Sequence, residues 1–224
     1  MKVAILGKIF KSEPTEYITK IISLLEKKKV SVFLEFEYFK SLKGFISESV
    51  SSFNELDKSF DLLISIGGDG TILKAITFVK DLSIPIVGVN TGRLGFLAKI
   101  QIENIELVIE EIILKNYSIS ERTLIEVSTS ETNQQLSKLN FALNEITLSR
   151  KNTTSMISID TKLDNKHLNS YWADGLIIST PTGSTGYSLS CGGPIIMPEA
   201  ENLIINPIAP HNLNARPLII PDST

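Results

Sequence analysis

The sequence predicts an α/β domain with a doubly wound parallel sheet, followed by an antiparallel β domain. Over roughly the first 100 of the 224 residues, short apolar runs alternate with stretches of helical periodicity. One run, at 61–66, is apolar almost throughout, as in a strand buried on both faces of a parallel sheet. From about residue 100 onward, short runs rich in β-branched residues are separated by polar turns, which favours antiparallel strands.

The elements of the first part follow in the order expected of a Rossmann-like sheet. The stretch at 12–29 places apolar residues on one helical face, has Pro14 near its start and ends in three lysines, which suit a helix C-terminus. We expect strands at 3–6, 30–39, 61–66 and 84–89, and helices at 12–29, about 42–56 and about 71–80. This βαβα order predicts a parallel sheet with helices on both faces.

The pattern changes near residues 98–103, where we place the domain boundary. Residues 1–100 are expected to form the α/β domain and residues 101–224 the β-rich domain. The second domain opens with one amphipathic helix at 103–115. Its short strands are expected at 123–129, 144–148, 156–161, 175–179, 203–205 and 218–220.

Composition excludes several classes of protein. Acidic residues outnumber basic ones by 25 to 22, so there is no basic stripe for nucleic acid. No apolar stretch approaches the roughly 18 residues that span a bilayer, and the N-terminus does not read as a secretory signal. A single cysteine, Cys191, cannot form an internal disulfide, and two histidines leave no cluster for zinc. We expect a cytoplasmic protein without nucleic-acid or membrane partners.

The most informative segment is the loop Gly67-Gly68-Asp69-Gly70-Thr71, between a buried strand and a helix. Glycines let backbone N–H groups approach a ligand, and the helix N-terminus attracts anions. Asp69 would repel phosphate unless a magnesium ion lies between them or the acid faces an attacking hydroxyl, and both arrangements point to phosphoryl transfer. The alternative is an ordinary turn with Asp69 as a helix cap. Neither a P-loop sequence nor Gly-x-Gly-x-x-Gly at a predicted helix start occurs.

Two further polar segments accompany this loop. Residues 90–97 follow the next strand and should lie beside it, with Arg93 as a hypothetical phosphate ligand or as a solvated side chain. In the β domain, Asn144-Glu145 offers an amide and a carboxylate that suit a ribose or an adenine edge, although turn chemistry explains such a pair more often than not. Residues 173–190 run from a strand into a dense Thr/Gly/Ser/Tyr loop, whose hydroxyls and amides can hold phosphate or ribose.

Four single residues near these segments can also be interpreted. Tyr187 could stack on a base, and Trp172 either lines the pocket or packs against its neighbours. Cys191 is expected to be a small packed residue, since no histidine lies nearby in sequence. His211 is expected to be structural.

Together these segments resemble the NAD kinase family, the ATP-dependent enzymes that phosphorylate NAD to NADP. The resemblance rests on Gly67–Thr71, on Leu143-Asn144-Glu145, on 174–187, on Pro207-Ile208-Ala209-Pro210-His211 with Arg216-Pro217-Leu218, and on Ile119-Ser120-Glu121-Arg122. It covers essentially the whole chain in the expected order. Gly-Gly-Asp-Gly-Thr alone is shared with diacylglycerol-type lipid kinases, but its combination with the Thr-Gly-Ser-Thr loop is specific.

The resemblance implies roles for individual residues. Asp69 would be the catalytic acid that orients or deprotonates the 2′-hydroxyl of the adenosine ribose. The implied NAD- and ATP-binding residues are Asp69, Gly70, Lys74, Asn144, Glu145, Ser155, Trp172, Asp174, Thr182, Thr185, Gly186, Tyr187, Ser190 and Ala209. ATP with magnesium or manganese would be the donor system, with the metal held through the ATP phosphates rather than by protein ligands. Members form homodimers or homotetramers with shared active sites.

Two departures from the family pattern leave alternatives open. Gly186 stands where the family usually has alanine, a small and permissive change. The family also continues beyond 217–221, so the second domain is expected to be incomplete at its C-terminus. Besides an NAD kinase, the sequence is compatible with a diacylglycerol-type lipid kinase, or with a non-catalytic fragment that only binds NAD.

Overall fold

A computed structural model describes residues 1–7, 15–92, 95–130, 136, 138–152 and 154–224. The chain divides into two compact units, 1–119 and 120–224. Helix α4 (Ile105–Ile113), which follows the predicted boundary, belongs to the first unit, where it packs on α1 (Glu16–Lys27). Within the described residues, no helix is both long and apolar enough to cross a membrane.

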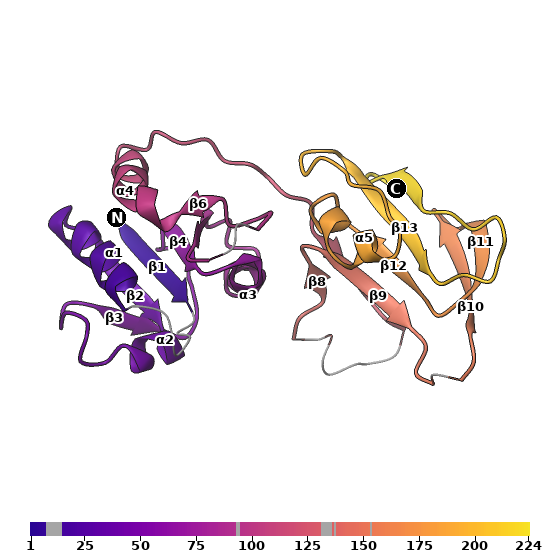
Figure 1. The fold of residues 1–224 in the computed structure, drawn as a ribbon, viewed down its shortest axis with the longest axis horizontal. Coiled ribbons are helices and arrows are strands. Elements are labelled where there is room, and N and C mark those ends of the chain that lie inside the picture. The colour runs from indigo at the N-terminus through magenta and orange to yellow at the C-terminus, as the bar shows by residue number, and fades with distance from the viewer. Residues whose placement is uncertain (8–14, 93–94, 131–135, 137, 153) are drawn as a thin grey trace. The chain divides into compact units, whose positions relative to one another are not determined.

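The first unit contains a parallel sheet of six strands among its described residues, in the order β3-β2-β1-β4-β5-β6 (Figure 1). Its strands are β1 (Lys2–Gly7), β2 (Ser31–Glu35), β3 (Ser51–Phe53), β4 (Leu62–Ile66), β5 (Ile86–Asn90) and β6 (Ile100–Gln101). Every neighbouring pair is parallel. The predicted doubly wound sheet is confirmed, and its strand order reverses between β1 and β4, where such sheets bind ligands.

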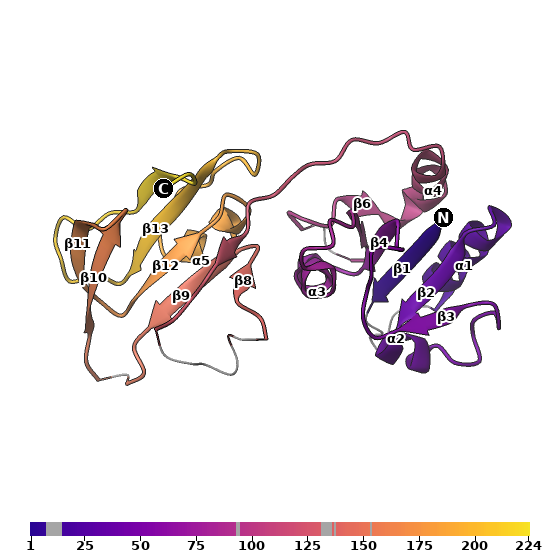
Figure 2. The same cartoon turned by 180° about the vertical axis from the view of Figure 1, so that it is seen from behind.

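Helices cover both faces of this sheet because its strands are apolar on both sides. Val3 and Ile5 of β1 pack with α1 and α4, whereas Ala4 and Leu6 pack with α3 (Asp69–Val79). In both views α3 lies apart from α1 and α4 (Figures 1 and 2). The first turn of α3 is thereby fixed at the carboxyl end of β4.

Two predicted elements of the first unit are wrong. The strand expected at 30–39 ends at Glu35, where α2 (Phe36–Ser41) begins with the Glu35 carboxylate accepting the backbone N–H of Tyr38. The helix expected at about 42–56 is absent from these residues, which are all described, and β3 pairs there with β2. Of the helix start expected at 12–15, residues 12–14 lie outside the described part of the chain, and α1 begins at Glu16.

The second unit is antiparallel, as predicted. Its main sheet has the order β14-β13-β12-β9, accompanied by a hairpin of β10 and β11 and a short pair of β7 and β8. The strands are β7 (Ile125–Glu126), β8 (Phe141–Ala142), β9 (Glu145–Ser149), β10 (Ile157–Leu163), β11 (Lys166–Ala173), β12 (Gly175–Ser179), β13 (Asn202–Ile208) and β14 (Leu218–Pro221). Neither β8 nor the polar strand β11 was predicted from the sequence.

A different segment of the chain packs on each face of the main sheet in this unit. The hairpin packs Ile159 and Tyr171 against Leu176 and Ile205 on one face. On the other face, Asn206 is buried and donates from Nδ2 to the Ser188 carbonyl at 2.9 Å. Ser188 belongs to α5 (Tyr187–Ser190), which follows the short 3₁₀ helix η2 (Thr182–Thr185). The Thr/Gly/Ser/Tyr loop is therefore folded onto this face of the sheet.

Candidate functional site

The glycine-rich loop of the first unit forms a tight turn from β4 into α3. Gly67 has φ +141°, and a β-carbon there would come 2.4 Å from Thr71 Oγ1, so only glycine fits. Its backbone N–H donates to the Val89 carbonyl at 2.9 Å, which ties the loop to β5. Gly68 and Gly70 are exposed with open space around them. The loop thus leaves its backbone accessible at the first turn of α3.

Asp69 is held by the neighbouring loop. Its Oδ2 accepts the backbone N–H of Phe96 at 2.8 Å, and its Oδ1 accepts those of Leu97 at 2.9 Å and Ala98 at 3.0 Å. The predicted proximity of the two loops is therefore observed. Arg93, the hypothetical phosphate ligand in this segment, lies outside the described residues.

Asn90 ties down both ends of that second loop. It is buried at the end of β5, where its Oδ1 accepts the Gly92 N–H at 2.7 Å and its Nδ2 donates to the Ala98 carbonyl at 3.4 Å. The sequence analysis named Asn90 only as part of the loop. An asparagine directly after a buried strand was the available signal, since asparagine side chains commonly bind nearby backbone groups in turns.

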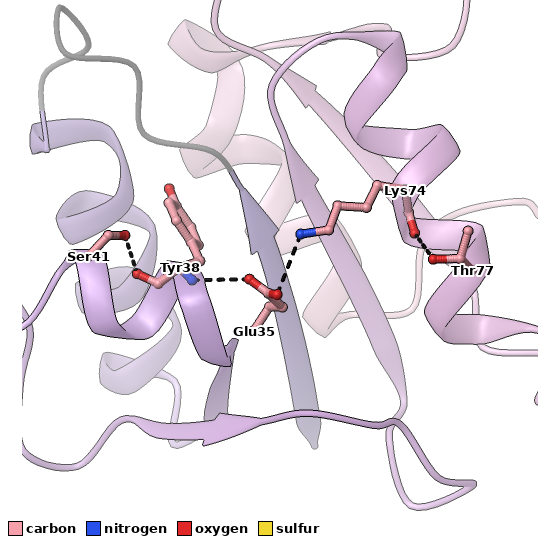
Figure 3. A network of polar contacts seen from close by, with 5 residues as sticks. All are labelled: Glu35, Tyr38, Ser41, Lys74 and Thr77. Carbon is pink, nitrogen blue, oxygen red and sulfur yellow. Dashed lines mark hydrogen bonds and ion pairs between the residues drawn. The ribbon is translucent and has the colours of Figure 1, made fainter.

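Lys74 lies about one turn beyond the loop on α3. Its ammonium is 3.4 Å from Oε1 of Glu35, at the end of β2 (Figure 3). The sequence analysis did not single out Glu35, because it placed this residue inside a longer strand. The structure therefore brings together Asp69, Gly70 and Lys74 on α3, the helix that starts at the carboxyl edge of the sheet.

In the second unit, Asn144 and Glu145 lie at the start of β9, beside the end of β12. Glu145 is opposite Ser179 in the antiparallel register. The Asn144 carbonyl accepts the Thr180 backbone N–H at 2.9 Å, and the Thr180 hydroxyl donates to the Leu143 carbonyl at 2.5 Å. These bonds fix the point where the chain leaves β12 for η2.

The loop after β12 approaches Asn144 and Glu145 so closely that two of its residues must be small. A β-carbon on Gly183 would come 2.1 Å from the Asn144 carbonyl oxygen, and one on Gly186 would come 2.9 Å from Glu145 Oε2. Thr182 Oγ1 and Glu145 Oε2 are buried and have no hydrogen-bond partner among the described residues. Buried polar atoms of this kind are normally satisfied, so either an ordered water or a polar ligand is the expected partner.

Two ionisable side chains here have shifted pKa values. Burial raises the pKa of the Glu145 carboxyl above its ordinary 4.5, and the backbone N–H of Tyr187 opposes that shift. The pKa of the Tyr187 hydroxyl is raised by the adjacent Cys191, through the negative charge of its thiolate and a hydrogen bond, and Asp174 acts in the same direction. Tyr187 therefore interacts with Glu145 through its backbone N–H and with Cys191 through its side chain.

Asp174 forms an ion pair with Arg150. The Arg150 Nη1 is 3.0 Å from Asp174 Oδ1, and the Arg150 backbone N–H donates to the Asp174 carbonyl at 2.9 Å. Both side chains are about a quarter exposed. Arg150 was not predicted from the sequence, because it follows β9 and its partner precedes β12, and only the pairing of Ser149 with Gly175 brings the two together.

The remaining predicted residues occupy the surface of the second unit. The Trp172 ring packs on His211 with centroids 4.5 Å apart, and the His211 N–H donates to the Trp172 carbonyl at 2.8 Å. Ala209, with φ +43°, starts the turn that leads to His211. Thr185 of η2 is partly buried, and Ser190 is exposed at the end of α5. Ser155 is exposed in the β9–β10 connection, and no observed contact joins it to the others within the described residues.

The described residues contain no group of three or more His, Cys, Asp or Glu side chains that could hold a metal ion. Magnesium in phosphotransferases is commonly bound by one or two carboxylates together with substrate phosphates. Asp69 supplies one such carboxylate at the accessible first turn of α3, so the donor set is compatible with a metal held mainly through phosphate.

Comparison with known proteins gives matches along most of the chain. Residues 4–117 match the family model for the ATP-NAD kinase N-terminal domain, and residues 143–224 match that for the ATP-NAD kinase C-terminal domain. Two similar curated proteins are the NAD kinases of Christiangramia forsetii, at 53% identity, and Flavobacterium psychrophilum, at 52%. Each alignment covers 100% of this chain and 78% of the relative.

Solved structures of kinases share the fold. Yeast NADH kinase in complex with NADH matches with a TM-score of 0.85 at 27% identity, over 98% of this chain and 69% of that one. An NAD kinase from Archaeoglobus fulgidus in complex with ATP matches with a TM-score of 0.75 at 28% identity, over 99% of this chain and 77% of that one.

Proposed function

Since this chain belongs to the NAD kinase family, we propose that it transfers the γ-phosphoryl group of ATP to the 2′-hydroxyl of the adenosine ribose of NAD. Asp69 orients this hydroxyl in the proposal. The observation that carries this role is the anchoring of its carboxylate by the N–H groups of Phe96, Leu97 and Ala98. An acceptor that is fixed before the substrate binds lowers the entropy that orientation would otherwise require.

In this proposal, Asp69 acts mainly by positioning the ribose hydroxyl. A carboxylate oxygen has two lone pairs, and Oδ2 accepts one observed N–H, so it can still accept the ribose hydroxyl. In phosphoryl transfer the nucleophile must lie in line with the leaving oxygen, and little covalent chemistry is left to the protein. Asp69 therefore holds the hydroxyl in line and takes its proton late.

The second unit supplies the proposed NAD-binding residues. The buried atoms Glu145 Oε2 and Thr182 Oγ1 support this assignment because they are free to bind a polar ligand. The proposed NAD-binding set is Asn144, Glu145, Ser155, Trp172, Asp174, Thr182, Thr185, Gly186, Tyr187, Ser190 and Ala209. Gly70 and Lys74, on the same helix as Asp69, would contribute nucleotide-binding groups from the first unit.

Three further features belong to the proposal. A divalent ion, magnesium or manganese, would neutralise phosphate charge when it is bound through the ATP phosphates, and Asp69 would be the carboxylate available to it from the protein. The protein would act in the cytoplasm. It would form a homodimer or homotetramer with shared active sites, which sedimentation or light scattering would detect as a mass of two or four chains.

The decisive assay measures NADP formed from NAD, ATP and magnesium by the wild type, by Asp69→Asn and by Asp81→Asn. Asp81 is an exposed acid just beyond the other end of α3, so its variant is the control for lost charge. We expect Asp69→Asn to lose at least about 100-fold in turnover. NAD affinity by calorimetry should stay nearly unchanged for both variants. Equal loss of turnover and NAD affinity in Asp69→Asn would contradict the assigned role.

The alternatives give different results in the same assay. A lipid kinase would phosphorylate diacylglycerol and form no NADP. A non-catalytic fragment would bind NAD in the calorimeter without forming NADP. Either result would overturn the proposed function.

A further inference from the structure

Glu35 and Lys74 form a polar network at the carboxyl edge of the parallel sheet (Figure 3). Glu35 Oε2 accepts the Tyr38 backbone N–H at 3.0 Å, and Oε1 lies 3.4 Å from the Lys74 ammonium. The Lys74 carbonyl in turn accepts the hydroxyl of Thr77 at 2.8 Å. The network joins α2 to α3, two helices that follow different strands.

The two charged partners differ in burial. The Glu35 side chain is 10% exposed, whereas that of Lys74 is 51% exposed. A buried carboxylate is costly unless hydrogen bonds and an opposite charge compensate it. Glu35 is also the N-cap of α2, so the backbone fixes its position. Glu35 is thus the fixed partner, and the flexible Lys74 side chain extends toward it.

The pair lies beside the topological switch point of the sheet. Lys74 is on the helix after β4, Glu35 ends β2, and β1 is the strand between β2 and β4. Lys74 therefore reaches past the carboxyl end of β1. Gly7 is the last residue of β1, and a β-carbon there would come 2.4 Å from Tyr38 Cζ. The Tyr38 side chain of α2 therefore packs directly on Gly7. Doubly wound sheets bind nucleotides in the crevice outside these strand ends.

We propose that Glu35 is a positioning residue that holds the Lys74 ammonium where it binds the triphosphate of the ATP donor. This inference rests on the proposed function. An ammonium group has three donors, so the bond to Glu35 leaves two for phosphate oxygens. Paired lysine and glutamate side chains play the same part in protein kinases, where the acid orients the lysine toward phosphates.

The test compares the wild type with Lys74→Met, Glu35→Gln and the double variant. Glu35→Gln keeps an oxygen for the Tyr38 N–H and removes the charge that attracts Lys74. The control is Lys80→Asn, which removes a lysine from the opposite end of the same helix. Lys80 has φ +49° and ψ −120°, the conformation of the first central residue of a type II′ turn, where asparagine is among the favoured residues. For each protein we would measure KM for ATP, KM for NAD, kcat, the melting temperature, and ATP affinity by calorimetry.

We expect Lys74→Met to raise KM for ATP about tenfold, the effect of losing one charged phosphate contact of about 1.4 kcal/mol. Glu35→Gln should raise it about threefold, and KM for NAD should stay within about twofold in both. In the Lys74→Met background, Glu35→Gln should add less than about twofold, because Glu35 acts through Lys74. Lys80→Asn should match the wild type.

Several results would overturn the inference: an unchanged KM for ATP in Lys74→Met, an equal effect of Glu35→Gln with and without Lys74, or no binding of ATP to the wild type. A general loss of melting temperature with equal rises in both KM values would assign Glu35 a structural role instead. If the wild type binds ATP but forms no NADP, the proposed function fails. The calorimetric comparison of the variants then still decides the role of Glu35.

Discussion

A β-carbon on Gly95 would lie 2.3 Å from Oδ1 of Asp69. This close approach is what allows the backbone of residues 96–98 to reach the carboxylate with three N–H groups. The glycine therefore serves the side chain of another residue rather than its own backbone conformation. The position of Asp69 depends on backbone groups that lie 27 to 29 residues later in the chain.

Replacing Gly95 by alanine should displace this loop and with it Asp69. We expect kcat to fall about 10- to 100-fold, since a shift of about 1 Å in a reacting group has effects of that size. KM for NAD should stay within about twofold, because the proposed NAD-binding residues lie mainly in the second unit. Steady-state kinetics with NAD and ATP provide the measurement.

Gly92→Ala is the matched control, since no atom lies within 4 Å of a β-carbon there. It should keep wild-type kcat. If both variants lose activity equally, the loop is sensitive to any added methyl group, and the contact with Asp69 is not the cause.

Gly183 and Gly186 make a second testable contrast. At Gly183 a β-carbon would meet the backbone oxygen of Asn144 at 2.1 Å, and backbone cannot move aside cheaply. At Gly186 the nearest atom, 2.9 Å away, is the end of the flexible Glu145 side chain, and the nearest backbone atom, the Gly183 carbonyl oxygen, is 3.1 Å away. Gly183→Ala should destabilise the protein by about 1–3 kcal/mol, as overpacking does. Gly186→Ala should cost less than about 1 kcal/mol.

Urea unfolding would measure both effects. The single tryptophan, Trp172, lies in the second unit and reports on it by fluorescence. The Gly186→Ala result also tests the expectation that alanine, the usual family residue, is tolerated here. A larger loss of stability in Gly186→Ala than in Gly183→Ala would contradict the packing argument.

Burial of Glu145 predicts a pH dependence of stability. Its folded pKa is raised above the ordinary 4.5, so ionising it costs more in the folded than in the unfolded protein. This penalty is absent below the ordinary pKa, appears as the pH rises from there, and is complete above the raised value. Glu145→Gln removes it. The variant should therefore gain stability relative to the wild type between about pH 4 and about pH 7.

Urea midpoints at the two pH values, again followed by Trp172 fluorescence, would measure this gain. The control is Glu121→Gln, at an exposed position in the same unit. A stability difference for Glu145→Gln that is constant with pH, or that shifts in favour of the wild type as the pH rises, would show that burial of the carboxylate is not the cause.

Local sequence patterns were sufficient for strands β1, β4 and β5 of the parallel sheet and for the glycine loop. The apolar run at 61–66 and the glycines after it placed Asp69 at the carboxyl edge, because both depend only on neighbouring residues. The end of β2 could not be predicted in this way. Phe36 and Tyr38 continue the alternation of a strand, but the Glu35 carboxylate caps the N–H of Tyr38 and starts a helix there.

The partners of the candidate site residues were also beyond local patterns. The N–H groups that bind Asp69 come from a loop 27 to 29 residues away. Glu35 and Lys74 are 39 residues apart and meet only because α2 and α3 follow different strands of one sheet. The sequence therefore singled out Asp69 and Lys74 as candidates, but it did not predict the groups that contact them.

Arg150 is a further such partner, and its variants test the importance of the ion pair with Asp174. Arg150→Ala leaves a carboxylate that is only 29% exposed without its cation. We expect a stability loss of about 0.5–1 kcal/mol, as for partly exposed pairs. If Asp174 binds NAD as proposed, a misplaced carboxylate should raise KM for NAD about 5- to 10-fold and leave KM for ATP within about twofold.

Arg150→Lys separates charge from geometry. Lysine keeps the charge but not the fixed planar fork of arginine, so it should recover stability more fully than NAD affinity. In the Arg150→Ala background, Asp174→Asn should raise KM for NAD by a smaller factor than it does in the wild type, because both changes break the same interaction. Full additivity of the two changes in KM for NAD would show that Arg150 and Asp174 act independently, and the ion pair would then have no part in holding Asp174 for the dinucleotide.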